Sequence, residues 1–152
     1  MKRNIARATL TVLSFAMLLA GLAAAGRAQT IGCSLSTLKG TYSVQGQGTI
    51  IAQFPGFPAP PFPFAEVASD FIDGAGNITG KYTFNAGGVV LSGTVVGTYT
   101  MNPDCTGTFS LLLTDLGIPV NESFVVRRNG SLRLAETDPF AVITRTMEKM
   151  RD

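Results

Sequence analysis

The side chains available for chemistry in this sequence are carboxylates, tyrosines, lysines and arginines, because its 152 residues include no histidine. Without histidine the chain has no Ser-His-Asp triad, no Cys-His dyad and no histidine-ligated metal site. Two cysteines are too few for a four-cysteine zinc site or an iron–sulfur cluster. The composition therefore predicts no cofactor and no metal, and it favours a non-catalytic protein over an enzyme.

Glu122 and Arg145 are the charged residues that best fit a buried polar site. Glu122 alternates with the apolar Val120 and Phe124, and Arg145 follows Ile143 at the same spacing. Alternate residues of a strand share a face, so both charges are expected to point inward and to pair across an interior or floor a polar pocket. A register shift of one residue would turn both outward, and this alternative is open at this point.

Glu66 and Asp70 share one face of another expected strand. Four strand residues of roughly 3.3 Å each separate them by about 13 Å. That distance exceeds the about 6.5–9.5 Å between the carboxylates of the wider kind of glycosidase site. We expect both side chains on a solvated outer face, with the alternating Ala65, Val67 and Phe71 facing inward.

An aromatic, proline-rich stretch covers residues 54–64 and holds five of the eight prolines and four of the ten phenylalanines. Proline favours the polyproline II conformation, in which every third residue shares a face. This spacing puts Phe54 and Phe57 together and Phe62 on another edge. The stretch is expected either to plug one mouth of the fold or to contact a ligand, partner protein or membrane surface. Tyr82 and Tyr99 complete the candidate ligand contacts.

Residues 1–28 have the pattern of an export signal. Three basic residues precede an apolar run over residues 8–25, and the small residues Gly26 and Ala28 end it. A membrane anchor and a lipoprotein acylated at Cys33 are the alternatives. With the signal removed, residues 29–152 are expected to form one secreted or periplasmic domain with no stable membrane span.

Cleavage of the signal reverses the sign of the net charge. Residues 1–28 contain four of the 12 basic residues and none of the 10 acidic ones, so the formal charge changes from +2 to −2. A mildly acidic domain lacks the basic face that nucleic-acid binding needs. We therefore expect no nucleic acid as a partner, and the oligomeric state is left open.

Export also predicts a disulfide between Cys33 and Cys105. The alternative, a reactive thiol at Cys105, needs an activating base, and the chain has no histidine to supply one. Closing such a long loop stabilises a fold by roughly 4 kcal/mol in the chain-entropy model.

The elements that must position these residues are strands almost throughout. The eight expected strands cover residues 40–52, 64–73, 78–84, 89–101, 105–114, 120–127, 131–136 and 140–147. Short turns and the absence of a helical crossover predict an all-β, antiparallel up-and-down meander. Closure removes exposed edges, so a small barrel is favoured, with a two-sheet sandwich as the alternative. Glycines interleaved with aromatics on the inner face predict a narrow, mostly packed interior.

Residues 71–80 and 97–108, together with 40–43, resemble a group of small secreted bacterial proteins without assigned function. The shared motifs are Phe-Ile-Asp-Gly-Ala-Gly-Asn-Ile-Thr-Gly and Gly-Thr-Tyr-Thr-Met-Asn-Pro-Asp-Cys-Thr-Gly-Thr. This resemblance implies a scaffold and no particular reaction. The expected meander is also similar to lipocalin-type and allene-oxide-cyclase-type barrels, an analogy of fold that transfers no activity.

Three functions follow from these features. The first is binding of a small apolar or aromatic molecule near the aromatic loop and a barrel mouth. The second is a structural or adhesive module of the cell envelope, acting through an exposed loop or a threonine-rich outer face. The third is a barrel enzyme using Glu122 with Tyr82 or Tyr99. A lined cavity would favour the first or the third, and a filled barrel with an exposed aromatic loop would favour the second.

Overall fold

The structure, a computed structural model, describes residues 32–151. The expected export signal, residues 1–28, lies outside the described residues. The elements are η2 (Leu35–Leu38), β1 (Gly40–Ile50), β2 (Phe62–Ile72), β3 (Asn77–Ala86), β4 (Val89–Met101), β5 (Thr106–Leu113), β6 (Ile118–Val126), β7 (Leu132–Glu136) and β8 (Ala141–Lys149). Within residues 32–151, no helix is long and apolar enough to cross a membrane.

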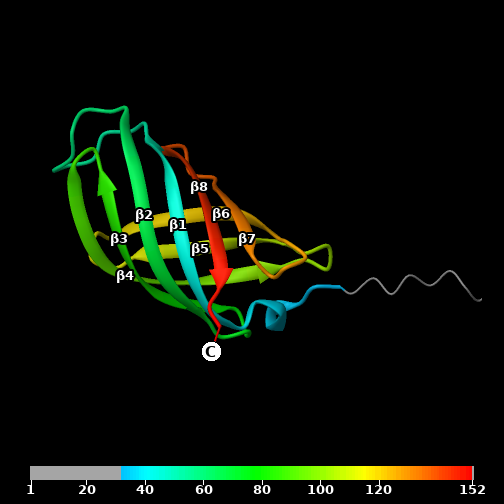
Figure 1. The fold of residues 1–152 in the computed structure, drawn as a ribbon. Helices are drawn as coiled ribbons and strands as arrows, with labels where there is room; N and C mark the ends of the chain where they lie inside the picture. The colour runs from blue at the N-terminus through cyan, green and yellow to red at the C-terminus, as the bar shows by residue number, and fades with distance from the viewer. Residues whose placement is uncertain (1–31, 152) are drawn as a thin grey trace, which may run out of the picture. The chain divides into compact units, whose positions relative to one another are not determined.

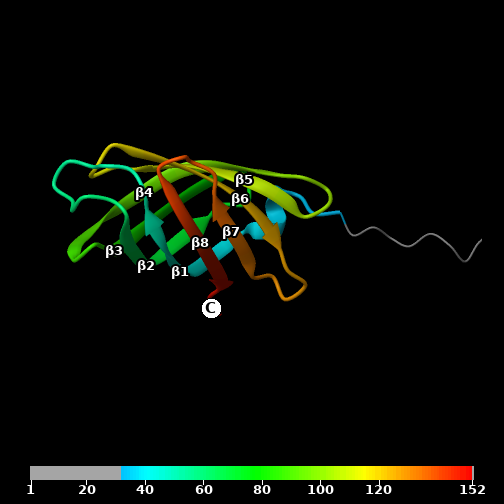
Figure 2. The same cartoon turned by 90° about the horizontal axis from the view of Figure 1, so that it is seen from above.

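The strands form a closed antiparallel barrel in sequence order (Figures 1 and 2). Each strand pairs with the next, and β8 returns to pair with β1, with Gly46 opposite Arg145. Closure gives every strand a paired neighbour on both sides, which is the physical advantage of a barrel over an open sheet. The predicted all-β meander and its closure are confirmed, and the sandwich alternative is wrong.

Alternating burial along the strands decides which residues face the interior. In β1, β3 and β4 the inner faces are the predicted ones, as with the buried Tyr42, Tyr82 and Val95. In β2 the predicted face is wrong: Val67 and Phe71 are 60% and 49% exposed.

The true inner face of β2 carries the opposite alternation. Its members are Phe62, Phe64, Glu66, Ala68, Asp70 and Ile72. Both faces of this strand contain apolar residues, so alternation alone does not fix the register. Burial of two phenylalanines and an isoleucine favours this face. The positive charge of Arg145 inside the barrel reduces the cost of burying the two carboxyl groups with them.

The interior is divided into two apolar clusters at opposite ends. One cluster packs Leu38 of η2 against Tyr42, Phe109 and other buried side chains. At this end the predicted disulfide joins Cys33 to Cys105 of the β4–β5 turn, with Cα atoms 5.0 Å apart. The Tyr99 hydroxyl donates a 2.8 Å hydrogen bond to the Leu35 carbonyl. Together these contacts fasten η2 and close this end of the barrel.

The β1–β2 connection covers the other end, away from η2 in both views (Figures 1 and 2). Phe54 and Phe57 are half-buried there, and their rings meet edge to face at 6.4 Å. Phe57 also stacks on Phe62 with a centroid distance of 6.1 Å. The prediction that Phe62 lies on another edge is therefore wrong, because β2 already begins at Phe62 and turns its ring inward beneath Phe57.

Candidate functional site

A cavity of about 90 Å³ lies inside the barrel beneath the β1–β2 connection. A water needs only about 10–15 Å³ by the same kind of measure, so the space can hold a small organic molecule. Its walls are mainly apolar and aromatic, with contributions that include Phe54, Phe57, Phe84, Leu111 and Ile143. Its polar lining residues are Glu66, Asp70, Tyr82, Glu122, Glu136 and Arg145.

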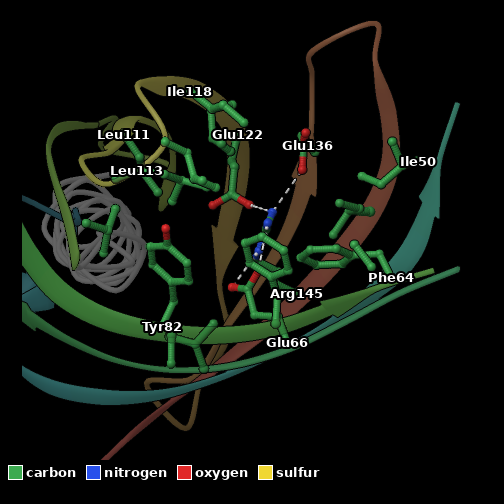
Figure 3. A pocket seen from close by; sticks show the side chains of 18 of the residues that line it. Ile50, Phe64, Glu66, Tyr82, Leu111, Leu113, Ile118, Glu122, Glu136 and Arg145 are labelled. Atoms are coloured by element: carbon green, nitrogen blue, oxygen red, sulfur yellow. Dashed lines mark hydrogen bonds and ion pairs between the residues drawn. The ribbon is translucent and has the colours of Figure 1, made fainter. Parts of the chain in front are cut away.

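Arg145 of β8 holds three carboxylates in one network (Figure 3). Its Nε and Nη2 donate to the two carboxylate oxygens of Glu66, each at 3.0 Å. Its Nη1 donates to Glu122 and, at 3.1 Å, to Glu136. A two-pronged contact to Glu66 uses the planar fork of the guanidinium, which gives it both strength and a fixed orientation.

Gly46 of β1 leaves room for this arrangement. It lies between Glu66 of β2 and Arg145 of β8, opposite both in the strand registers. A Cβ atom at Gly46 would come within 3.0 Å of Arg145 Cγ and 3.5 Å of Glu66 Cδ. Because this position carries no side chain, the arginine can lie across β1 and reach the next strand.

The charged groups of this network are buried, so the pKa of each depends strongly on its charged neighbours. Arg145 is 8% exposed and Glu122 2%. Burial alone would lower the pKa of Arg145, but the facing carboxylates of Glu66 and Glu122 outweigh it and raise that pKa. Burial raises the pKa of Glu122 and of Glu136 in turn, with Arg145 acting in the opposite direction. Buried charges of this kind persist only when they are paired.

Asp70 of β2 lies inside the barrel without joining the network. It is 6% exposed, and its Oδ1 has no hydrogen-bond partner. Burial, followed by the nearby charges of Glu66 and Glu122, raises the pKa of Asp70 to about 7, while Arg145 works in the opposite direction. Gly80 of β3 leaves room for this carboxyl, since a Cβ there would lie 2.0 Å from Asp70 Oδ1.

Three buried polar atoms on the cavity-lining residues have no hydrogen-bond partner within the described chain. They are Asp70 Oδ1, the Tyr82 hydroxyl and Glu136 Oε1. Figure 3 shows Tyr82 outside the dashed network around Arg145. Unpaired buried polar atoms are uncommon in folded proteins and each costs free energy. The residues around this cavity therefore carry hydrogen-bonding capacity that no other described residue uses.

Most of the residues singled out from the sequence meet in this cavity. Phe54, Phe57, Phe62, Tyr82, Glu122 and Arg145 all line it. The predicted inward pairing of Glu122 with Arg145 is present, and the alternative of two outward-facing charges is wrong. Tyr99 lies elsewhere, in the core next to η2, where it packs against Phe109 at 6.0 Å.

Sequence reasoning missed Glu66, Asp70 and Glu136. The prediction of a solvated outer face for Glu66 and Asp70 is wrong, because the face of β2 that carries them points into the barrel. Glu136 shares its face of β7 with the buried Leu132 and Leu134, and that alternation was a usable signal.

No protein-family model and no curated protein sequence matches this chain. Among residues 32–151, no group of three or more histidine, cysteine or acidic side chains is arranged to hold a metal ion. The cavity can enclose a small guest between aromatic rings and offer it carboxyl and hydroxyl groups.

Proposed function

We propose that this protein is an exported, non-catalytic barrel that binds one small, largely apolar or aromatic molecule in its internal cavity. The observation that carries the proposal is the cavity itself, with apolar walls and three buried, unpaired polar atoms on the residues around it. Concave, mainly apolar sites with a few convergent polar groups are the usual form of small-molecule sites.

The aromatic rings support a preference for flat or ring-shaped guests. Tyr82 stacks on Phe84 at 5.5 Å, and Phe84 packs near Phe57 and Phe64 at 6.4 and 5.5 Å. Such rings favour stacked or edge-to-face contacts with another ring. The half-buried Phe54 and Phe57 of the β1–β2 connection line the same cavity and add their rings to these contacts.

Export is supported by two independent features. Residues 1–28 have the composition of a signal segment, and the disulfide between Cys33 and Cys105 fits an oxidising compartment. The resemblance to small secreted bacterial proteins also supports export. A lined cavity and a half-buried aromatic loop favour ligand binding over an adhesive envelope module that acts through an exposed loop.

Titration with benzyl alcohol tests the proposal, with NMR shifts of the Leu111 and Ile143 methyl groups as the readout. We expect saturable shifts in the wild type and their loss in Ala68→Phe, because Ala68 lines the cavity and a ring there fills it. Ala65→Phe is the matched control, since Ala65 is exposed on the outer face of the same strand. Binding that survives in Ala68→Phe contradicts the proposal, as does the absence of shifts both with benzyl alcohol and with charged probes of the same ring.

Acid–base catalysis on the bound molecule is a second candidate, and Asp70 is the observation that favours it. An acid with a pKa of about 7 in an apolar cavity can both give and accept a proton near neutral pH. The test is to release the molecule that the protein carries from its own host and incubate it with fresh protein. Chromatographic conversion by the wild type and none by Asp70→Asn would favour an enzyme, whereas an unchanged molecule favours a carrier.

A further inference from the structure

The polar half of the cavity determines which chemical class of guest it accepts. Four carboxyl groups and one guanidinium line it. With every group ionised the interior is negative, and it reaches neutrality only when carboxyls take up protons. In neither state does it carry a net positive charge. An anionic guest would therefore meet like charges in a buried site, a costly arrangement.

The guanidinium of Arg145 is not free to offset this cost. Its Nε and Nη2 donate to Glu66, and its Nη1 donates to Glu122 and Glu136. A guest carboxylate would have to displace one of these carboxylates and leave it buried without a partner. Removing one partner from such a buried pair is strongly destabilising.

The unsatisfied groups are mainly acceptors. Asp70 and Glu136 each present one unpaired carboxyl oxygen, and Tyr82 adds a hydroxyl that can accept as well as donate. Each of the three side chains is nine-tenths or more buried: Asp70 is 6% exposed, Tyr82 5% and the Glu136 side chain 1%. A guest that brings hydrogen-bond donors completes the hydrogen bonds of these groups. A positive charge on the donor also balances the negative charge of the carboxylates.

We propose, on the basis of the cavity-binding function above, that the guest is a small amine: an apolar or aromatic body carrying a protonated nitrogen. The body lies among the rings of Phe57, Phe84 and their neighbours. The nitrogen donates to the unpaired oxygen of Asp70.

Three probes that share one ring and differ in the polar group test this inference. Benzylamine is cationic, benzyl alcohol neutral and benzoate anionic near neutral pH. Their dissociation constants are measured by the same methyl NMR readout at pH 7.5 and moderate salt. We expect benzylamine to bind on the order of tenfold or more tighter than benzyl alcohol, and benzoate to bind weakest, because it alone brings a like charge to the carboxylates.

Asp70→Asn supplies the variant, because it keeps the shape of the side chain and removes the charge. Benzylamine should lose about tenfold in affinity, a larger loss than that of benzyl alcohol, since only the cation loses a charge-assisted bond. Asp104→Asn is the matched control: Asp104 is exposed in the β4–β5 turn, at the end of the barrel next to η2. That substitution should leave all three dissociation constants unchanged.

The outcomes separate this inference from the proposed function. Benzoate or benzyl alcohol binding in the cavity as tightly as benzylamine overturns the amine inference and leaves cavity binding standing. Failure of all three probes to shift the cavity methyls contradicts cavity binding itself. Benzylamine shifts that persist in Ala68→Phe report a surface contact and overturn the amine inference. The comparison of the three probes on the wild type decides the question even if Asp70→Asn does not fold.

Discussion

A buried arginine shared by three glutamates is an expensive feature that packing alone does not explain. Arg145 is 8% exposed, and the side chains of Glu66, Glu122 and Glu136 are 11%, 2% and 1% exposed. Transferring these four charged groups from water to the interior costs several kcal/mol per ion, and their mutual attraction offsets part of that free energy. The network fixes one geometry of the polar end of the cavity, and Arg145 is the residue on which that geometry depends.

Replacing Arg145 with methionine should therefore leave three buried carboxyl groups without a countercharge. We expect the free energy of unfolding at pH 7 to fall by about 3–5 kcal/mol, as for other broken buried pairs. The loss should shrink at pH 5, where burial lets Glu122 and Glu136 take up protons. Urea denaturation at the two pH values measures both effects. Arg133→Met is the control, since Arg133 is exposed on β7 and should cost less than about 1 kcal/mol. Equal losses for the two variants would contradict the account.

The Asp70 carboxyl predicts a second, pH-dependent effect. Its folded-state pKa of about 7 lies above the ordinary 3.8, because of burial and then Glu66 and Glu122, with Arg145 opposing. The folded protein therefore holds this proton to higher pH than the unfolded chain, and stability falls as pH rises from about 4 to about 7. Asp70→Asn should remove this slope, with a gain on the order of 4 kcal/mol at most at pH 8 and little change at pH 4.

Asp104→Asn provides a control of opposite sign for that measurement. Hydrogen bonds from Thr106 lower the pKa of Asp104, so its contribution to stability is present at neutral pH and lost as pH falls. The variant should be less stable than the wild type at pH 7 and converge with it at low pH. Urea midpoints at pH 4, 6 and 8 compare the two variants. A pH slope that survives in Asp70→Asn would show that Asp70 does not hold its proton in the fold.

At the scale of the strands, the sequence predicts where the strands lie but not which face of β2 points into the barrel. β4 has the predicted bounds, Val89–Met101, because both its turns and its alternation are clear. The predicted inner face of β2 is wrong, because apolar side chains lie on both faces of this strand and a partner on another strand decides between them. Glu66 and Asp70 were misplaced for that reason. Contacts between distant strands, such as Glu66 with Arg145, are not visible in a single strand's pattern.

Two glycines of β1 make a sharp test of close packing between β1 and β8. A Cβ at Gly48 would lie 2.1 Å from the Val142 carbonyl oxygen and 2.7 Å from Ile143 Cα, both backbone atoms. A Cβ at Gly46 would meet the flexible side chain of Arg145 at 3.0 Å. Gly48→Ala should therefore destabilise by about 1–3 kcal/mol or more, and Gly46→Ala by clearly less.

The same two substitutions gain equally from reduced freedom of the unfolded chain, so their difference isolates packing in the folded state. Thermal unfolding of both variants measures it. Equal midpoints for Gly46→Ala and Gly48→Ala would contradict the close approach of β1 to β8.

For the molecule as a whole, the disulfide ties the segment before η2 to the β4–β5 turn at the same end of the barrel. The cysteines are 72 residues apart, so Cys33→Ser with Cys105→Ser should lower the free energy of unfolding by about 2–4 kcal/mol. Cys105 has a φ of 67°, a conformation that glycine adopts without strain. Cys33→Ser with Cys105→Gly should therefore be about 1 kcal/mol more stable than the double serine variant. Urea denaturation compares them, and a less stable glycine variant would contradict this assignment of strain.

The sequence predicted the closed barrel, the disulfide and the inward Glu122 and Arg145, because each rests on a local pattern or on pairing rules. It predicted a mostly packed interior, which holds at the η2 end, where Tyr99, Phe109 and Leu38 fill the space. The cavity at the other end was not predictable, since it depends on how the β1–β2 connection, β2 and β8 meet.

The central claim is that a guest molecule completes the hydrogen bonds of the cavity. A crystal structure of the protein purified from the host that exports it tests this most directly. The account predicts electron density for a small molecule among the aromatic rings, with a nitrogen at hydrogen-bond distance from Asp70 Oδ1. A cavity that is filled by its own side chains, with Asp70, Tyr82 and Glu136 hydrogen-bonded within the protein, would contradict the central claim.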